Sequence, residues 1–210
     1  MVRIWLIPLA LASGGLHIHA EYQGRQSRIY LLKPLTTSLI IITAIAGQDP
    51  ISGVYKISII VGLIFSLIGD VFLMLPEDRF VAGLVSFLLA HISYLIAFTG
   101  DARNVMTLWL AAPFLLYALV FYVYLAPDLG KQRIPVLIYT IVISSMAWAA
   151  WGRWLRLGGI GSMLAAIGAV LFVISDSSLA YNRFHKEHHW GQLLTLSSYY
   201  LAQMLIAWSV

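Results

Sequence analysis

The sequence contains no cysteine and few charged residues. Because none of the 210 residues is cysteine, disulfides, thiol catalysis and cysteine-ligated metal sites are excluded. Only 10% of the residues are charged, whereas a typical soluble domain carries about 25%. So few charges cannot coat a water-facing globule, and this composition excludes an ordinary soluble domain.

Basic residues are present but are not gathered into a cluster. The formal net charge is +4 at pH 7, spread over many short polar segments. That distribution suits contact with anionic lipid headgroups. It does not indicate a nucleic-acid site, so no nucleic-acid partner is expected, and the sequence points to no particular oligomeric state.

Apolar runs of about 20 residues recur along the whole chain, each long enough to cross ~30 Å of hydrocarbon as a helix. The runs are continuous rather than alternating, which favours helices over a β-barrel. The sequence therefore predicts an all-α, polytopic integral membrane protein with eight transmembrane helices in a single domain over residues 1–210. The expected helices cover residues 3–20, 30–47, 54–75, 80–99, 104–125, 133–151, 157–180 and 190–209.

The first apolar run and the charges of the loops bear on the membrane topology. We read residues 3–20 as a transmembrane helix rather than a signal peptide, because no exported soluble domain follows. Eight helices place both termini on one side. The loops on the other side carry more Lys and Arg, which favours a cytoplasmic position for those loops.

A weak internal repeat links the two halves of the chain. Leu67-Ile68-Gly69-Asp70 is followed by Arg79-Phe80, and Val173-Ile174-Ser175-Asp176 is followed by Arg183-Phe184. Duplicated halves are common among membrane folds, and chance similarity of two helix ends is the alternative.

Two aspartates are expected inside apolar helices. Asp70 precedes Pro76 by six residues, which places it ~9 Å inside a helix end, and Asp176 is expected at a similar depth. Ionisable groups in a bilayer usually face a cavity or a partner. The sequence favours a polar pocket shared by both carboxyl groups; the alternative pairs each one with Lys33, Arg79 or Arg183.

Other polar residues are candidates for the same pocket. His91 is expected near mid-membrane, one turn before Tyr94, where it acts either as a hydrogen-bonded strut or in proton transfer. Lys33 either extends to the headgroups or holds a substrate phosphate. Further candidates are Asn182, Tyr199 and Gln203, whereas Tyr139 is interpreted as a contact between helices.

The sequence also contains histidine-rich segments. The segment His185-Lys186-Glu187-His188-His189 matches neither His-Glu-x-x-His nor His-x-x-Glu-His, the two spacings typical of a helical zinc site. It is expected to be a solvated loop. His17 and His19 are interpreted in the same way. No metal site is therefore expected.

One distinctive block of the sequence runs from Gly69 to Pro76 and continues through Arg79-Phe80 to Leu84, Phe87, His91 and Tyr94. It resembles the signature of the YhhN membrane family, whose animal members are lysoplasmalogenases. Further matches are Lys33-Pro34, Gly168-Ala169, Phe172, Ser175-Asp176, Ala180, Arg183-Phe184, Tyr199-Tyr200 and Ala202-Gln203. The resemblance spans nearly the whole chain in order.

The resemblance implies an eight-helix hydrolase of lysoplasmalogens, which are lysophospholipids with a vinyl-ether chain at sn-1. The implied products are a fatty aldehyde and glycerophosphoethanolamine or glycerophosphocholine. The implied partner is thus a membrane lipid substrate, and the implied location is a bacterial inner membrane.

The chemistry of vinyl-ether hydrolysis suits two carboxyl groups. One acid protonates the β-carbon, and an anion stabilises the oxocarbenium ion and steers water, as in glycoside hydrolysis. We assign these roles to Asp70 and Asp176 without deciding which is which, with His91 assisting proton delivery or water activation. Lys33 is expected at the phosphate. Tyr94, Asn182, Tyr199 and Gln203 are expected to bind the substrate, and no cofactor is required.

Two other functions remain open from the residues. A metal-dependent intramembrane amidase or esterase would need about three converging ligands, for which only Asp70, His91 and Asp176 are well placed. A non-catalytic lipid carrier or proton-coupled transporter would also use buried carboxylates and duplicated halves.

Overall fold

Long α-helices make up nearly all of the described chain. The computed structural model describes residues 2–48, 52–100, 108–186, 188 and 190–210, and over these ranges it contains no strand. The helices are α1 (Val2–Tyr22), α2 (Gln26–Ile45), α3 (Gly53–Met74), α4 (Phe80–Gly100), α5 (Ala111–Leu125), α6 (Arg133–Leu157), α7 (Ile160–Phe184) and α8 (Gly191–Trp208). Short 3₁₀ turns precede α5 (Leu108–Leu110) and link it to α6 (Ala126–Asp128 and Gly130–Gln132).

Six of the helical segments are long and apolar enough to cross a membrane. They contain α2, α3, α4, α5, α6 and α7. The prediction of an all-α membrane protein is confirmed, whereas the count of eight spans stays a prediction. Helix α8 carries buried polar side chains, among them Ser198, Tyr199 and Gln203, because it packs inside the bundle rather than facing lipid on all sides.

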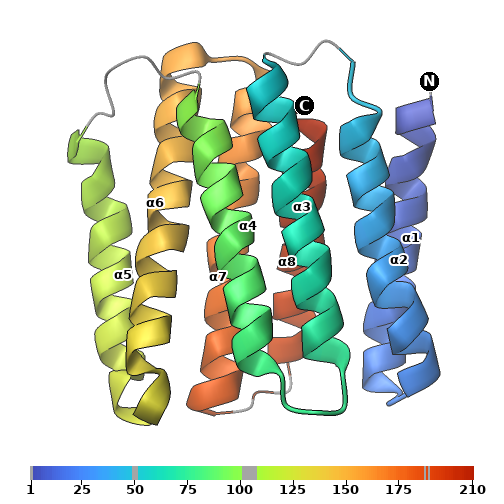
Figure 1. The fold of residues 1–210 in the computed structure, drawn as a ribbon, viewed down its shortest axis with the longest axis vertical. Helices are drawn as coiled ribbons and strands as arrows, with labels where there is room; N and C mark the ends of the chain where they lie inside the picture. The colour runs from blue at the N-terminus through green and yellow to red at the C-terminus, as the bar shows by residue number, and fades with distance from the viewer. Residues whose placement is uncertain (1, 49–51, 101–107, 187, 189) are drawn as a thin grey trace.

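Six helices form a closed ring in the order α2, α3, α4, α6, α7, α8, with α8 packed back against α2. Helix α1 packs outside the ring on α2 and α8, and α5 packs mainly on α6 (Figure 1). In this order α3 and α7 lie on opposite sides of the ring. The polar side chains that these two helices point inward therefore face a common interior.

The turns that follow α1, α3, α5 and α7 lie together at one end of the bundle. In Figure 1 this is the lower end, and both chain termini lie at the upper end. We call the lower end the turn end. The upper end is tied by side chains: the Lys56 ammonium donates to the carbonyls of Ile45 and Gly47, and the Tyr55 hydroxyl bonds the Ser209 hydroxyl at 2.6 Å.

Glycines allow α3 and α4 to approach closely. A Cβ atom on Gly62 would lie 2.3 Å from the Tyr94 ring, and one on Gly69 would lie 2.6 Å from the Phe87 ring. Tyr94 is fully buried, so its ring has no free space to move into, whereas the Phe87 ring borders two cavities. Packing therefore requires glycine most strictly at Gly62.

Several helix boundaries differ from the sequence-based prediction. Residues 152–156 were expected to form a loop, but α6 continues to Leu157 because the buried Arg153 guanidinium packs 4.2 Å from the centre of the Tyr55 ring. Helix α7 continues to Phe184, so Arg183 lies in its last turn, whereas Arg79 precedes α4. Lys33 and Pro34 lie within α2, which begins at Gln26. Residues 104–107 of the fifth expected helix lie outside the described residues.

We predict that Gly62→Ala destabilises the protein by about 1–3 kcal/mol, since the new methyl group overpacks the α3–α4 interface. The matched control is Gly152→Ala in α6, where a Cβ meets nothing within 4 Å and alanine favours the helix. Thermal unfolding in detergent measures both. Equal melting temperatures for the two variants would contradict the packing argument.

Candidate functional site

Asp70 lies in α3 among polar groups from α2 and α8. Its Oδ2 atom accepts hydrogen bonds from the hydroxyls of Thr37, at 2.6 Å, and Tyr199, at 2.7 Å. The Lys33 ammonium lies 3.8 Å from Oδ1. Asp70 is only 1% exposed, and a buried carboxyl group is stable only with such partners. We call these four side chains the Asp70 cluster.

Asp176 lies in α7 in a second polar group, with partners from α4 and α6. Tyr139 donates its hydroxyl hydrogen to Asp176 Oδ2, and His91 Nε2 lies 3.0 Å from the same oxygen. His91 Nε2 also lies 2.8 Å from the Tyr139 hydroxyl, so the three groups form a triangle. We call these three side chains the Asp176 cluster. Together, the two clusters draw one or two polar side chains from each of the six ring helices.

Aromatic rings separate the two clusters. The Phe172 ring packs edge-on against the rings of His91, at a centroid distance of 4.8 Å, and Tyr199, at 5.5 Å. The Phe87 ring also meets Tyr199 edge-on at 5.8 Å. Phe172 thus contacts both clusters, and the hydrogen bonds of Asp70 and Asp176 go to different side chains.

A polar cavity at the turn end of the bundle brings the two aspartates together. The cavity has a volume of about 450 Å³, and Asp70 and Asp176 both line it. Lys33 and Tyr199 line it as well, on the Asp70 side. The pocket shared by the two carboxyl groups, which the sequence favoured, is therefore present in the structure.

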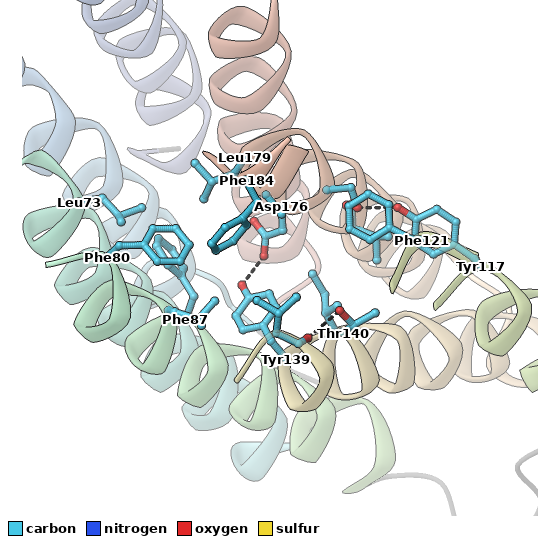
Figure 2. Close-up of a pocket in the computed structure, with 16 residues that line it drawn as sticks. Leu73, Phe80, Phe87, Tyr117, Phe121, Tyr139, Thr140, Asp176, Leu179 and Phe184 are labelled. Atoms are coloured by element: carbon cyan, nitrogen blue, oxygen red, sulfur yellow. Dashed lines mark hydrogen bonds between the residues drawn. The ribbon is translucent and has the colours of Figure 1, made fainter. Parts of the chain in front are cut away.

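A smaller apolar cavity continues from Asp176 toward α5 and α6. Figure 2 shows Asp176 and Tyr139 pointing toward one another in this cavity, with Phe80, Phe87 and Phe121 around them. Leu73, Phe80, Phe87, Asp176 and Leu179 line both cavities. The apolar cavity has a volume of about 40 Å³, which is room for roughly three water molecules. A hydrocarbon chain therefore enters it only if the side chains that line it move apart.

Ion pairs surround the mouth of the polar cavity. In the α3–α4 turn, Arg79 pairs with Glu77, and Asp78 pairs with Arg183 from the end of α7 at 2.5 Å. The Arg183 hydrogen bond, followed by that of the Phe80 amide, holds the pKa of the exposed Asp78 carboxyl below its usual range. The pair joins opposite sides of the ring at the turn end.

Three predicted substrate-binding residues lie elsewhere. Tyr94 is fully buried, with its hydroxyl 3.4 Å from Ser66. Gln203 is fully buried in α8, and neither of its amide atoms has a hydrogen-bond partner among the described residues. Asn182 accepts a hydrogen bond from the His188 amide and lines a separate surface groove between α7 and α8. The two cavities bring together Lys33, Asp70, Asp176 and Tyr199, with His91 behind Asp176.

Sequence reasoning missed Thr37 and undervalued Tyr139. Thr37 lies four residues after Lys33, on the same helix face, and this spacing is the signal that could have identified it. Tyr139 does connect helices, as expected, but its partners are Asp176 and His91. The interpretation of His17 as solvated is wrong. The His17 side chain is fully buried against α8, where its Nδ1 atom lies 2.9 Å from the Tyr200 hydroxyl.

In the histidine-rich loop, His185 pairs with Asp128 at 2.5 Å. Glu187 and His189 lie outside the described residues. Within the described ranges, no three His, Asp, Glu or Cys side chains come together in a group that could hold a metal ion.

These observations define an α-helical membrane protein with two carboxyl clusters on one internal cavity. The chain belongs to the YhhN family, whose family model matches residues 29–210. No solved structure matches the chain.

Curated relatives come from animals and bacteria. The chain is 36% identical to human lysoplasmalogenase TMEM86A over 159 residues, which cover 72% of this chain and 64% of the human protein; the match thus spans less than two thirds of that relative. Mouse lysoplasmalogenase TMEM86B is 32% identical, over 98% of this chain and 85% of its own length. The Escherichia coli O157:H7 protein named uncharacterized membrane protein YhhN is 26% identical, over 99% of both chains.

We predict that Arg183→Gln raises the pKa of the Asp78 carboxyl toward its ordinary value of about 3.9, because the variant removes the neighbouring cation. A lowered pKa means that the pair stabilises the folded state at pH values above the unfolded pKa. That contribution is lost as pH falls through the folded pKa. NMR titration of the Asp78 carboxyl measures the change; Arg79→Gln, whose partner is Glu77, serves as the control. An unchanged Asp78 pKa in Arg183→Gln would contradict the assignment.

Proposed function

We propose that this protein is an intramembrane hydrolase that cleaves the sn-1 vinyl-ether bond of lysoplasmalogens. The observation that carries the proposal is that Asp70 and Asp176, on opposite sides of the helix ring, line one cavity. Hydrolysis of a vinyl ether needs a proton donor for the β-carbon, and by analogy with glycoside hydrolysis a second carboxylate stabilises the oxocarbenium ion. The lysoplasmalogenase names of the mammalian relatives support the same substrate class.

The two cavities suit the two parts of a lysophospholipid. The polar cavity opens at the turn end, and we assign Lys33, which lines it beside Asp70, to the phosphate. The apolar cavity beyond Asp176 is placed to receive the start of the hydrocarbon chain once its side chains move apart. A lipid bound in this way has its vinyl-ether bond between Asp70 and Asp176.

We assign the role of acid to the Asp176 cluster. His91 Nε2 and the Tyr139 hydroxyl both contact Asp176 Oδ2, so a proton can be shared among the three groups. The acid donates this proton to the β-carbon of the vinyl ether, whose double bond supplies the electron pair. An oxocarbenium ion then forms at the carbon attached to oxygen.

We assign the role of anion to Asp70. Two hydroxyl donors and the Lys33 ammonium face this carboxyl group, and such partners favour its ionised form. The carboxylate stabilises the oxocarbenium ion and directs water to it, and the proton released by that water returns to the acid. The resulting hemiacetal then loses its hydroxyl proton, a proton passes to the glycerol oxygen as the C–O bond breaks, and the products are a fatty aldehyde and a glycerophosphodiester with a free sn-1 hydroxyl.

The structure bears differently on the two alternative functions. A carrier needs a cavity reachable from both membrane faces, whereas the residues that line this cavity come from the middle and the turn end of the bundle. A metal-dependent amidase or esterase needs three converging ligands. Asp70 and His91 instead belong to separate clusters. Both observations favour the vinyl-ether hydrolase.

We further propose that all eight helices cross a bacterial inner membrane, with the turn end in the cytoplasm. Helices α1 and α8 pack along α2, which supports a parallel course through the bilayer. The cytoplasmic placement follows the excess of Lys and Arg in the loops of the turn end. The cavity mouth then faces the cytoplasmic leaflet.

We predict that Asp70→Asn and Asp176→Asn each lower aldehyde release by roughly 10²-fold or more, the usual contribution of a positioned acid or base. The assay uses purified protein in detergent with a vinyl-ether lysophospholipid as substrate, and aldehyde is quantified directly. Both amides nearly match the shape of the carboxyl group, so thermal unfolding should show that the variants fold.

The matched control is Asp128→Asn, which removes an exposed carboxylate outside both cavities. This variant should release aldehyde at the wild-type rate, and no protein should release aldehyde from the saturated alkyl-ether analogue. Wild-type activity in Asp70→Asn or Asp176→Asn would remove that residue from the mechanism. No aldehyde from the wild-type protein would refute the hydrolase.

A further inference from the structure

Two of the carboxylates that line the polar cavity have no Lys or Arg partner among the described residues. Five acidic and three basic side chains of the described residues line this cavity. Three acids face Lys or Arg: Asp70 faces Lys33, Glu77 pairs with Arg79, and Asp78 pairs with Arg183. Asp176 is held by His91 and Tyr139. The remaining acid is Glu21, near the end of α1.

Glu21 lies one helical turn after a buried histidine, His17. His17, one turn earlier in α1, has its Nε2 atom 3.3 Å from Glu21 Oε1, and the imidazole is fully buried while the Glu21 side chain is 22% exposed. His17 Nδ1 in turn lies 2.9 Å from the Tyr200 hydroxyl in α8. This hydrogen bond connects α1 to α8, whereas His17 Nε2 has no hydrogen-bond partner among the described residues. Glu21 itself lines the cavity at its mouth.

We propose that Glu21 binds the primary ammonium group of a phosphoethanolamine headgroup. The inference rests on the proposed function for the lipid class and adds the headgroup. Asp70 lies deepest, Lys33 lies next to it, and Glu21 lies at the turn end. This order matches glycerol, phosphate and ammonium along a single lipid. The cavity thus presents a cation for the phosphate and, farther out, an anion for the amine.

The chemistry of Glu21 selects an ammonium over a trimethylammonium group. A carboxylate accepts charge-assisted N–H···O bonds, and a primary ammonium supplies three N–H donors. Choline has none, and its methyl groups keep its charge farther from the carboxylate. Glu21 is therefore a specificity-determining residue that contacts the headgroup.

The test measures binding rather than turnover, so that it stands apart from the hydrolase assay. Lysophosphatidylethanolamine and lysophosphatidylcholine with the same ester-linked chain compete against a fluorescent lysolipid on the purified protein. Wild-type protein should prefer the ethanolamine lipid by roughly tenfold, the effect of one hydrogen bond to a charged group. Glu21→Gln should bind the two lipids equally, with choline lipid affinity little changed.

Two further variants make the result specific. Glu21→Asp keeps the charge and should retain part of the preference. Glu77→Gln removes a carboxylate from the same cavity mouth that Arg79 already neutralises, and should keep the full preference. Equal binding by the wild-type protein, a preference that persists in Glu21→Gln, or a loss shared by Glu77→Gln would overturn the inference. Aldehyde release from vinyl-ether substrates tests the proposed hydrolase separately.

Discussion

The burial of two carboxyl groups inside an apolar helix bundle is the constraint on which the rest of this structure depends. Asp70 is only 1% exposed, and a buried charge without partners would cost several kcal/mol. Its partners come from α2 and α8, and those of Asp176 come from α4 and α6. The ring of six helices is therefore also the arrangement that brings each carboxyl group its donors.

The two carboxyl groups have different surroundings. Phe172 packs against His91 of one cluster and Tyr199 of the other, and among the described residues Asp70 and Asp176 share no hydrogen-bond partner. One group faces a lysine and two hydroxyls, and the other faces an imidazole and a phenol. Different surroundings are the usual way in which an enzyme divides acid and anion between two like residues.

The sequence predicted the helical membrane class and the pocket that both aspartates line, because an ionisable residue in an apolar run needs a partner or a cavity. It did not predict that α3 and α7 lie opposite one another, since that order depends on contacts between distant helices. The predicted end of α6 was wrong because Arg153 was taken for a loop residue, although an aromatic ring covers it. The environment of Glu21 was also missed, since the burial of His17 depends on α8.

The closure of the ring by α8 has a consequence for biosynthesis. Asp70 lies in α3, but its partner Tyr199 lies in α8, which leaves the ribosome later. A nascent chain that has inserted α3 and α4 therefore holds an incompletely paired carboxyl group until α8 packs between α7 and α2. The two clusters and the cavity that both aspartates line therefore exist together only after α8 has packed into the ring.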